Sequence, residues 1–185
     1  MGSEKTKSSI DMHSRVVTIC EGAVMAAMAL GLSYLKFKLF PTGGSIDVVM
    51  VPLLVLSIRR GAGWGIGASL VFGTLKCIMS EGIAYGWHAM IMDYSLAYAM
   101  VGLAGFFRSN ITLAVTVGTL GRYIVHVISG VVLWGQWIPD EFLGITMTNT
   151  LVYSLIYNAT FMIPSFIIAL ALVLLISKKT KLLSV

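Results

Sequence analysis

Charged residues are scarce in this sequence: Asp, Glu, Lys and Arg make up only 11% of the 185 residues. Soluble domains average about 25%. Hydrophobic residues reach 57% and gather in long runs, so we expect an integral membrane protein with several spans. The length suits one compact bundle of about six helices without a separate soluble domain.

Cysteine is also rare, and the two present, Cys20 and Cys77, lie in apolar segments without a neighbouring ligand. This pattern predicts small buried hydrophobes and indicates neither a disulfide framework nor a metal site. The sequence has no glycine-rich nucleotide loop followed by Lys-Ser or Lys-Thr, so ATP-driven transport would need an ATPase on another chain. It has no internal repeat with matching broken helices, which argues against a typical inverted-repeat transporter. We expect no cofactor.

The net charge of +5 does not indicate nucleic acid binding, because the basic residues form no single stripe among aromatic residues. We also find no cleavable signal peptide, since the first sixteen residues are polar and the first apolar run is too long for an h-region. The lipid bilayer is therefore the expected environment.

Six apolar runs predict an all-α membrane protein, a bundle of six transmembrane helices. We place them at residues 16–35, 46–58, 64–79, 88–107, 111–134 and 149–176. The second run is short for a hydrocarbon core of about 30 Å. Residues 1–15 form a polar N-terminal segment, 16–177 the membrane domain and 178–185 a basic tail.

Orientation follows from the basic residues, because cytoplasmic loops carry an excess of Lys and Arg. Nine of the 13 fall on one side: Lys5, Lys7, Arg15, Arg59, Arg60, Arg108, Lys178, Lys179 and Lys181. Both termini are then cytoplasmic. Five of the eight acidic residues fall in or near the outer half, which favours a cationic ligand.

The fifth run carries polar residues at membrane depth. Arg122, His126 and Ser129 share one helical face, and Trp134 lies two turns above His126. Polar side chains persist in hydrocarbon mainly where they face a cavity, a partner or a ligand. We interpret this face as one wall of a small-molecule site. A satisfied packing histidine is the alternative for His126, and a structural charge is the preferred interpretation of Arg122.

The fourth run contributes Asp93, a carboxylate suited to charge-assisted hydrogen bonding with an amine or a protonated ring nitrogen. Its alternative role is a structural partner for Arg122 or Lys76. Lys76 itself is expected to extend to the membrane interface. Trp134 offers a ring face to a cationic heterocycle, with the aromatic belt at the membrane interface as the alternative.

The remaining candidates are tyrosines and an asparagine. Tyr153 and Tyr157 share a face of the last helix, whereas Asn158 must point into the bundle. Tyr85 and Tyr94 could close the site from the side of the third and fourth helices. Convergence of these separate polar groups at one depth is more informative than any one of them.

Small residues recur every four positions in the first span, at Ala23, Ala27 and Gly31. Such spacing allows another helix to approach closely in lipid. The stripe serves either internal packing or docking of a separate protein.

Several stretches together resemble a known family over nearly the whole chain from about residue 17. They are AVMAAMAL at 23–30, VPLLVLSIRRG at 51–61, GLAGFFR at 102–108, YIVH at 123–126 with Ser129, Gly130 and Trp134, and then Tyr153 and Asn158. The chain looks like a thiamine-specific S component, the substrate-capture subunit of energy-coupling factor (ECF) vitamin transporters.

The resemblance implies a non-enzymatic subunit of the bacterial plasma membrane that binds thiamine from outside. It implies a shared transmembrane coupling protein, which the small face of the first span docks against, and two ATPase subunits whose ATP hydrolysis reorients the bundle. By family position, Asp93 binds the pyrimidine with Tyr94 beside it, and Trp134 stacks on the thiazolium. His126, Tyr153 and Asn158 supply other polar contacts, and Tyr85 matches a family tyrosine if one residue is gapped.

Two departures from the family pattern concern the ligand. Asp93 is one methylene shorter than the usual glutamate, and Gly43 stands where some members have a tryptophan. Two alternatives therefore stay open: the same fold binding a thiamine precursor or related heterocycle, and a stand-alone proton-coupled carrier using Asp93 and His126. An intramembrane enzyme is not supported, because no nucleophile or metal constellation accompanies these residues.

Overall fold

The computed structural model describes residues 2–40, 43–80, 86–180 and 183. Six helices run through these ranges. The first part of the chain forms α1 (Gly2–Leu32), β1 (Lys36–Phe40), β2 (Gly43–Asp47), α2 (Met50–Arg60) and α3 (Ala62–Met79). One continuous helix follows, built from α4 (Trp87–Ala89), the π-helix η2 (Met90–Leu96), α5 (Ala97–Ala99) and the 3-10 helix η3 (Met100–Phe106). The remaining elements are α6 (Ile111–Val132), η4 (Gly135–Trp137), β3 (Glu141–Phe142), β4 (Ile145–Thr146) and α7 (Thr150–Lys179).

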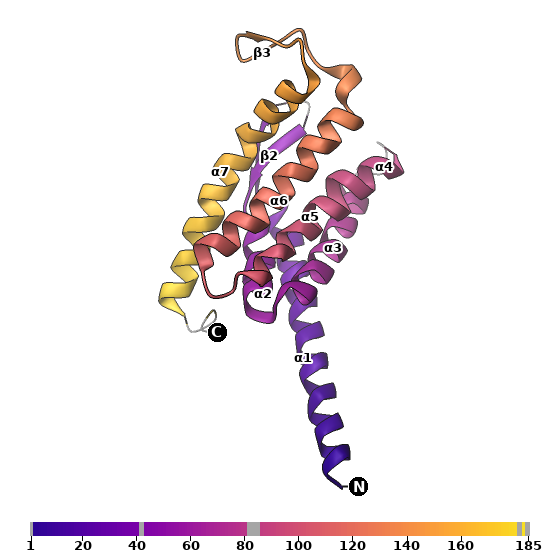
Figure 1. The fold of residues 1–185 in the computed structure, drawn as a ribbon, viewed down its shortest axis with the longest axis vertical. Coiled ribbons are helices and arrows are strands. Elements are labelled where there is room, and N and C mark those ends of the chain that lie inside the picture. The colour runs from indigo at the N-terminus through magenta and orange to yellow at the C-terminus, as the bar shows by residue number, and fades with distance from the viewer. Residues whose placement is uncertain (1, 41–42, 81–85, 181–182, 184–185) are drawn as a thin grey trace.

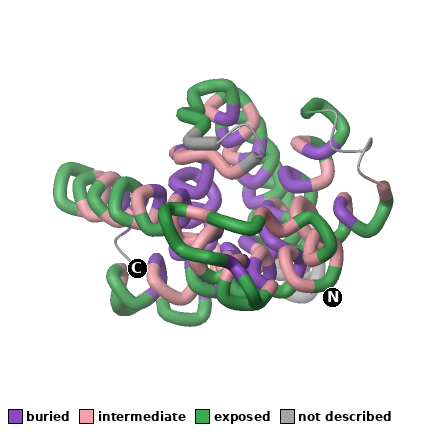
Figure 2. Tube along the Cα trace, turned by 90° about the horizontal axis from the view of Figure 1, so that it is seen from above, coloured by how far each residue is buried: buried purple, intermediate pink, exposed green. Residues whose placement is uncertain are grey.

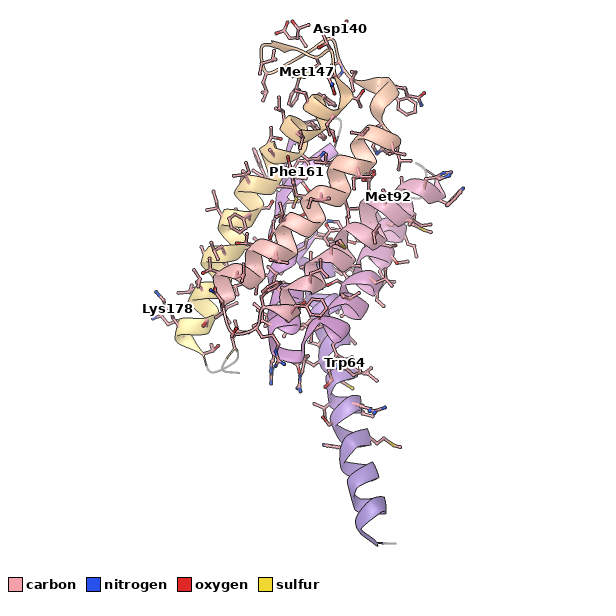
Figure 3. The ribbon with its side chains drawn as sticks, viewed as in Figure 1. Trp64, Met92, Asp140, Met147, Phe161 and Lys178 are labelled. Carbon is pink, nitrogen blue, oxygen red and sulfur yellow. The ribbon has the colours of Figure 1, made fainter. Side chains whose placement is uncertain are left out.

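The helices form one elongated bundle with both chain ends at the same end (Figure 1). The α2–α3 turn and the connection before α6 also lie at this end, whereas the β3–β4 hairpin lies at the opposite one. Figure 3 places Lys178 near the first end and Asp140 at the other. Five helices of the described ranges are long and apolar enough to cross a membrane. The predicted six-helix membrane fold is confirmed, and the two termini lie at one end of the bundle as expected, while the assignment of that end to the cytoplasm stays a prediction.

The second helix departs from the expected bounds. It begins at Met50 rather than at residue 46 and has 11 residues, a length of about 16 Å. Residues 43–47 instead pair with Lys36–Phe40 as an antiparallel hairpin, with Lys36 opposite Asp47. The alternation of lysine and phenylalanine in β1 is a strand period, and the hairpin supplies the outer part of this crossing.

The first helix also starts earlier than expected. α1 begins at Gly2, so most of the polar N-terminal segment continues the helix instead of preceding it. In Figure 1 this part of α1 projects well beyond the other helices. The core of the membrane domain therefore does not cover the start of the chain.

Helix α2 forms the centre of the core. Residues 50–58 are all buried, and Leu53, Leu54 and Ile58 have no exposed surface. Seen from above, the buried positions gather in the interior of the bundle (Figure 2). A helix that is apolar on every side is stable only when neighbours surround it, and residues from α1, η3, α6 and α7 complete this cluster.

Local signals explain where the helices begin. Gly61, with φ of +93°, joins α2 to α3 in a single residue, a backbone conformation that glycine adopts without a steric penalty. Asn110 and Asn149 cap α6 and α7, their side-chain oxygens accepting hydrogen bonds from Leu113 N at 3.0 Å and Leu151 N at 2.8 Å. Asparagine is a favoured cap because it satisfies a free N–H of the first turn.

Glu21 links α1 to the α2–α3 turn by ion pairs. Its Oε1 lies 2.8 Å from Arg59 Nη1, and its Oε2 accepts a hydrogen bond from Arg60 Nε at 2.7 Å. The side chain of Glu21 is only 12% exposed. One carboxylate therefore binds two guanidinium groups.

Replacing Glu21 with glutamine should lower the stability of the folded protein by about 1–2 kcal/mol, because two charge-assisted contacts are weakened. The measurement is the midpoint of thermal unfolding in detergent. Glu141→Gln, which changes an exposed residue of β3, is the matched control. Equal midpoints for the two variants would contradict this role of Glu21.

Candidate functional site

Asp93, His126 and Trp134 meet toward the end of the bundle opposite the termini. Trp134 Nε1 donates a hydrogen bond to Asp93 Oδ2 at 2.9 Å, and His126 Nδ1 lies 3.5 Å from Asp93 Oδ1. Asp93 belongs to the π-helix η2, a type of turn that occurs frequently at functional sites. The structure therefore brings together three residues that the sequence places in two separate helices.

Arg122 extends this cluster toward the middle of the bundle. Its Nε donates to His126 Nε2 at 3.3 Å, as expected from their four-residue spacing. Its Nη2 donates to the hydroxyl of Tyr98 at 2.9 Å. The sequence analysis named Asp93 as an alternative structural partner of Arg122, whereas the partners of Arg122 here are an imidazole and a phenol.

Asn158 joins α7 to α6 behind the histidine. Its Nδ2 donates to the carbonyl oxygen of His126 at 3.4 Å and to that of Ser154 at 2.8 Å. Ser154 in turn donates to the carbonyl oxygen of Val127 at 3.0 Å. Asn158 is 5% exposed, so it faces the bundle as predicted, and it holds the backbone beside His126.

An aromatic column follows α7 from the outer end to the histidine. The ring centroids of Phe142 and Tyr153 are 5.4 Å apart, those of Tyr153 and Tyr157 are 5.5 Å apart, and those of Tyr157 and Phe161 are 5.8 Å apart. Phe161 lies edge-on to His126 at 6.1 Å. The column places flat, polarizable surfaces next to the polar cluster.

The other predicted residues occupy different positions. Tyr94 follows Asp93 on η2 and is half-buried. Tyr85 lies outside the described residues. Trp137 is 64% exposed with its ring centroid 5.9 Å from that of Trp134. On α1, Ala23, Ala27 and Gly31 are exposed.

The position of Lys76 contradicts the prediction that its side chain extends to the membrane interface. The side chain is 11% exposed and does not extend to the interface, because Nζ donates to the Tyr98 hydroxyl at 2.5 Å and lies 3.6 Å from Asp47 Oδ2. Sequence reasoning missed Tyr98 and the pairing of Lys76 with Asp47. The available signal was a lysine inside an apolar run, which is costly in lipid without a partner.

The chemistry of the Asp93 cluster suits a flat organic cation. A carboxylate held between two N–H groups is fixed in direction, and the Trp134 ring can lie against a positive heterocycle. Among the residues that the structure describes, no three His, Cys, Asp or Glu side chains lie close enough to hold a metal ion.

Comparisons with known proteins agree with this chemistry. Residues 19–184 match the family described as "Thiamine transporter protein". The chain is 33% identical over 193 residues to "Thiamine transporter ThiT" of Bacillus subtilis, covering 94% of this chain and 97% of that protein. It is 31% identical over 169 residues to the protein of the same name from Lacticaseibacillus paracasei, covering 80% and 81%.

A solved structure of ThiT from Listeria monocytogenes has the same fold, with a TM-score of 0.80 at 21% identity over 92% of this chain and 98% of that one. The resemblance that the sequence motifs carry is confirmed. Membrane-spanning helices and bacterial relatives also agree with a multi-pass protein of the cell membrane. The chain belongs to the thiamine transporter protein family.

Proposed function

We propose that this chain is the thiamine-binding S component of an ATP-driven ECF-type importer, which captures the vitamin from outside. The observation that carries the proposal is the Asp93 carboxylate, held by His126 and Trp134 beside an aromatic column. Thiamine is a monocation with two flat rings, so a fixed anion between aromatic surfaces matches its charge and shape.

The two rings of thiamine are assigned to different side chains. Asp93 accepts a hydrogen bond from the amino group of the pyrimidine, and the Trp134 ring stacks on the positive thiazolium. His126, Tyr153 and Asn158 satisfy further polar atoms, with Tyr94 and Tyr85 on the side of α3 and η2. The binding unit comprises residues 16–177, flanked by the cytoplasmic segments 1–15 and 178–185.

Titration of the purified protein with thiamine, followed by tryptophan fluorescence, tests the proposal. Saturable quenching is expected, because Trp134 would contact the ligand directly. Separate titrations with the pyrimidine and thiazole precursors are expected to show weaker binding, since each offers only half of the contacts. Saturation by a precursor but not by thiamine would overturn the proposed substrate.

Transport by this chain alone is the competing hypothesis, because the contact between Asp93 and His126 could carry a proton. Purified protein in liposomes under a pH gradient is expected to show no thiamine uptake without the coupling protein and ATPases. Uptake by the single chain would replace the importer-subunit assignment with that of a proton-coupled carrier.

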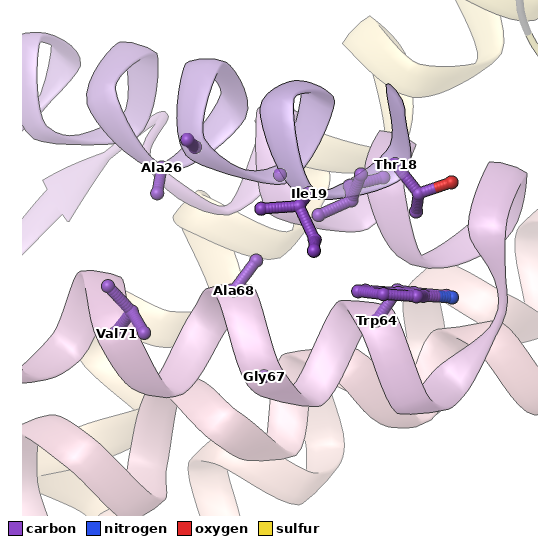
Figure 4. Close-up of a pocket in the computed structure, with 10 residues that line it drawn as sticks. Thr18, Ile19, Ala26, Trp64, Gly67, Ala68 and Val71 are labelled. Carbon is purple, nitrogen blue, oxygen red and sulfur yellow. The ribbon is translucent and has the colours of Figure 1, made fainter. Parts of the chain in front are cut away.

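The docking surface for the coupling protein is assigned to α1. Its small residues form two faces: Gly22, Ala26 and Ala29 are buried against the bundle, whereas Ala23, Ala27 and Gly31 are exposed. A groove of about 330 Å³ runs between α1 and α3 beside the exposed face, with Ile19, Trp64 and Val71 in its walls (Figure 4). Exposed small residues allow a partner helix to approach closely in lipid.

Replacing Ala27 with leucine should lower recovery of the complex with the coupling protein and ATPases about tenfold, because a larger side chain blocks close helix contact. Thiamine affinity should not change. Copurification after coexpression measures the first effect and titration the second. Ala171→Leu, the same change at an exposed position of α7, is the control, and equal recovery for both variants would contradict the assigned surface.

A further inference from the structure

Two buried cations share one tyrosine hydroxyl in the interior of the bundle. Lys76 Nζ and Arg122 Nη2 both donate to the Tyr98 oxygen, at 2.5 Å and 2.9 Å. The same groups lie over the Tyr98 ring, 4.9 Å and 4.2 Å from its centroid. Tyr98 is 2% exposed and Arg122 is 5% exposed. In an interior that excludes water, two positive charges at such separations repel each other strongly. Each cation therefore needs a negative charge nearby.

The compensation comes from two carboxylates at opposite ends of the cluster. Asp47 Oδ2 lies 3.6 Å from Lys76 Nζ, and the backbone N–H of Asp47 donates to Ser165 Oγ at 3.3 Å. At the other end, Arg122 reaches Asp93 through His126. Two cations and two anions are thereby balanced, and the neutral Tyr98 hydroxyl accepts a hydrogen bond from each cation.

The contact with Arg122 fixes the protonation of His126. A guanidinium group only donates hydrogen bonds, so His126 Nε2, 3.3 Å from Arg122 Nε, must offer its lone pair. The ring proton of the neutral imidazole then lies on Nδ1, which faces Asp93 Oδ1. Asp93 therefore receives one N–H from His126 and one from Trp134.

We propose that Tyr98 is a positioning residue for thiamine binding, acting through Arg122 and His126 on Asp93. This inference rests on the proposed function of the same site. Without the hydroxyl, Arg122 Nη2 becomes a buried donor lacking its acceptor, which is strongly unfavourable. The guanidinium group turns toward a carboxylate, Nε leaves His126, and the imidazole proton is no longer confined to Nδ1.

The test is Tyr98→Phe, which keeps the ring and its edge contact with Phe72 and removes only the hydroxyl. The control is Tyr123→Phe, at the position after Arg122 on α6. The hydroxyl of Tyr123 donates to the carbonyl oxygen of Leu155 at 3.0 Å. We measure the Kd for thiamine and the ¹⁵N NMR signals of the His126 ring. His13→Gln and His88→Gln in all samples remove the other two histidines.

Tyr98→Phe is expected to raise the Kd about tenfold, the effect of one lost hydrogen bond to a charged group. The His126 signals should change from a single Nδ1–H tautomer to a mixture, whereas Tyr123→Phe should change neither quantity. Weaker binding with an unchanged tautomer would make Tyr98 merely structural and overturn the proposal. An altered tautomer with unchanged affinity, or no change in either, would also overturn it.

The wild-type spectrum supplies a test that needs no folded variant, because a native His126 protonated on Nε2 would overturn the inference by itself. A different result would show that the proposed function is wrong. If wild-type protein showed the Nδ1–H tautomer and Tyr98→Phe altered it, but wild-type protein did not bind thiamine, the link from Tyr98 to His126 would stand and the substrate assignment would fall.

Discussion

Replacing Asp93 with asparagine should weaken thiamine binding about a hundredfold, equivalent to about 3 kcal/mol. The substitution removes the negative charge that attracts the cationic vitamin. It also replaces one carboxylate oxygen with an NH₂ group, a donor. His126 and Trp134 both present N–H groups to this side chain, so one of the two contacts becomes unfavourable. The Kd from fluorescence titration measures the effect.

Asp140→Asn is the matched control for this prediction. Asp140 is an exposed acid at the same end of the bundle (Figure 3), so its loss reports the effect of general negative charge at the outer surface. Its Kd should stay within about twofold of the wild type, because screened charges at exposed sites contribute little. Equal affinities for Asp93→Asn and the wild type would remove Asp93 from the binding site.

Replacing Trp134 with alanine should also weaken thiamine binding about a hundredfold. The variant loses the ring face offered to the thiazolium, a contribution of about 1–2 kcal/mol, and the N–H that donates to Asp93, a contribution of similar size. Trp134→Phe keeps a ring and loses only the donor, so its Kd is expected to fall between those of the wild type and the alanine variant.

Trp137→Ala provides the comparison for the stacking role. Trp137 is three residues away and 64% exposed, and its removal should leave the Kd nearly unchanged. If the two alanine variants lost affinity equally, the tryptophans would act as an interfacial aromatic pair and the ligand-stacking role of Trp134 would be wrong.

The part of the site that the sequence predicted depends on local geometry. Arg122 and His126 share a face because they are four residues apart on a helix, and this holds in any fold that keeps α6 intact. Asp93 and Trp134 were expected at the same depth because helix lengths and the basic loops fix the topology. Their direct contact is thus a consequence of span positions and helical period.

The β1–β2 hairpin was not predictable in the same way. The run at 46–58 is almost continuously apolar, and a short apolar run does not distinguish a strand followed by a buried helix from one spanning helix. The hairpin is stabilised by tertiary contacts, among them the hydrogen bond from Asp47 N to Ser165 in α7. The two residues are 118 positions apart, so no local pattern indicates the pair.

Lys76 and Tyr98 show a second limit of prediction from the sequence. A lysine near the end of a span reaches the interface unless a partner lies within the bundle. Here the partners are Asp47, in a strand that was not predicted, and Tyr98, in the following helix. Tyr98 had no distinguishing feature in the sequence, since its importance comes only from the two cations that converge on its hydroxyl.

The buried part of helix α2, residues 50–58, has a consequence for the proposed release of the vitamin. This part of α2 lies in the half of the bundle that holds the chain termini (Figure 1), whereas the Asp93 cluster lies toward the opposite end. A molecule bound at Asp93 would therefore have the packed core around α2 between it and the end of the bundle with the termini. As long as α2 keeps this packing, discharge of the vitamin on the side of the termini would require reorientation of the whole bundle within the lipid.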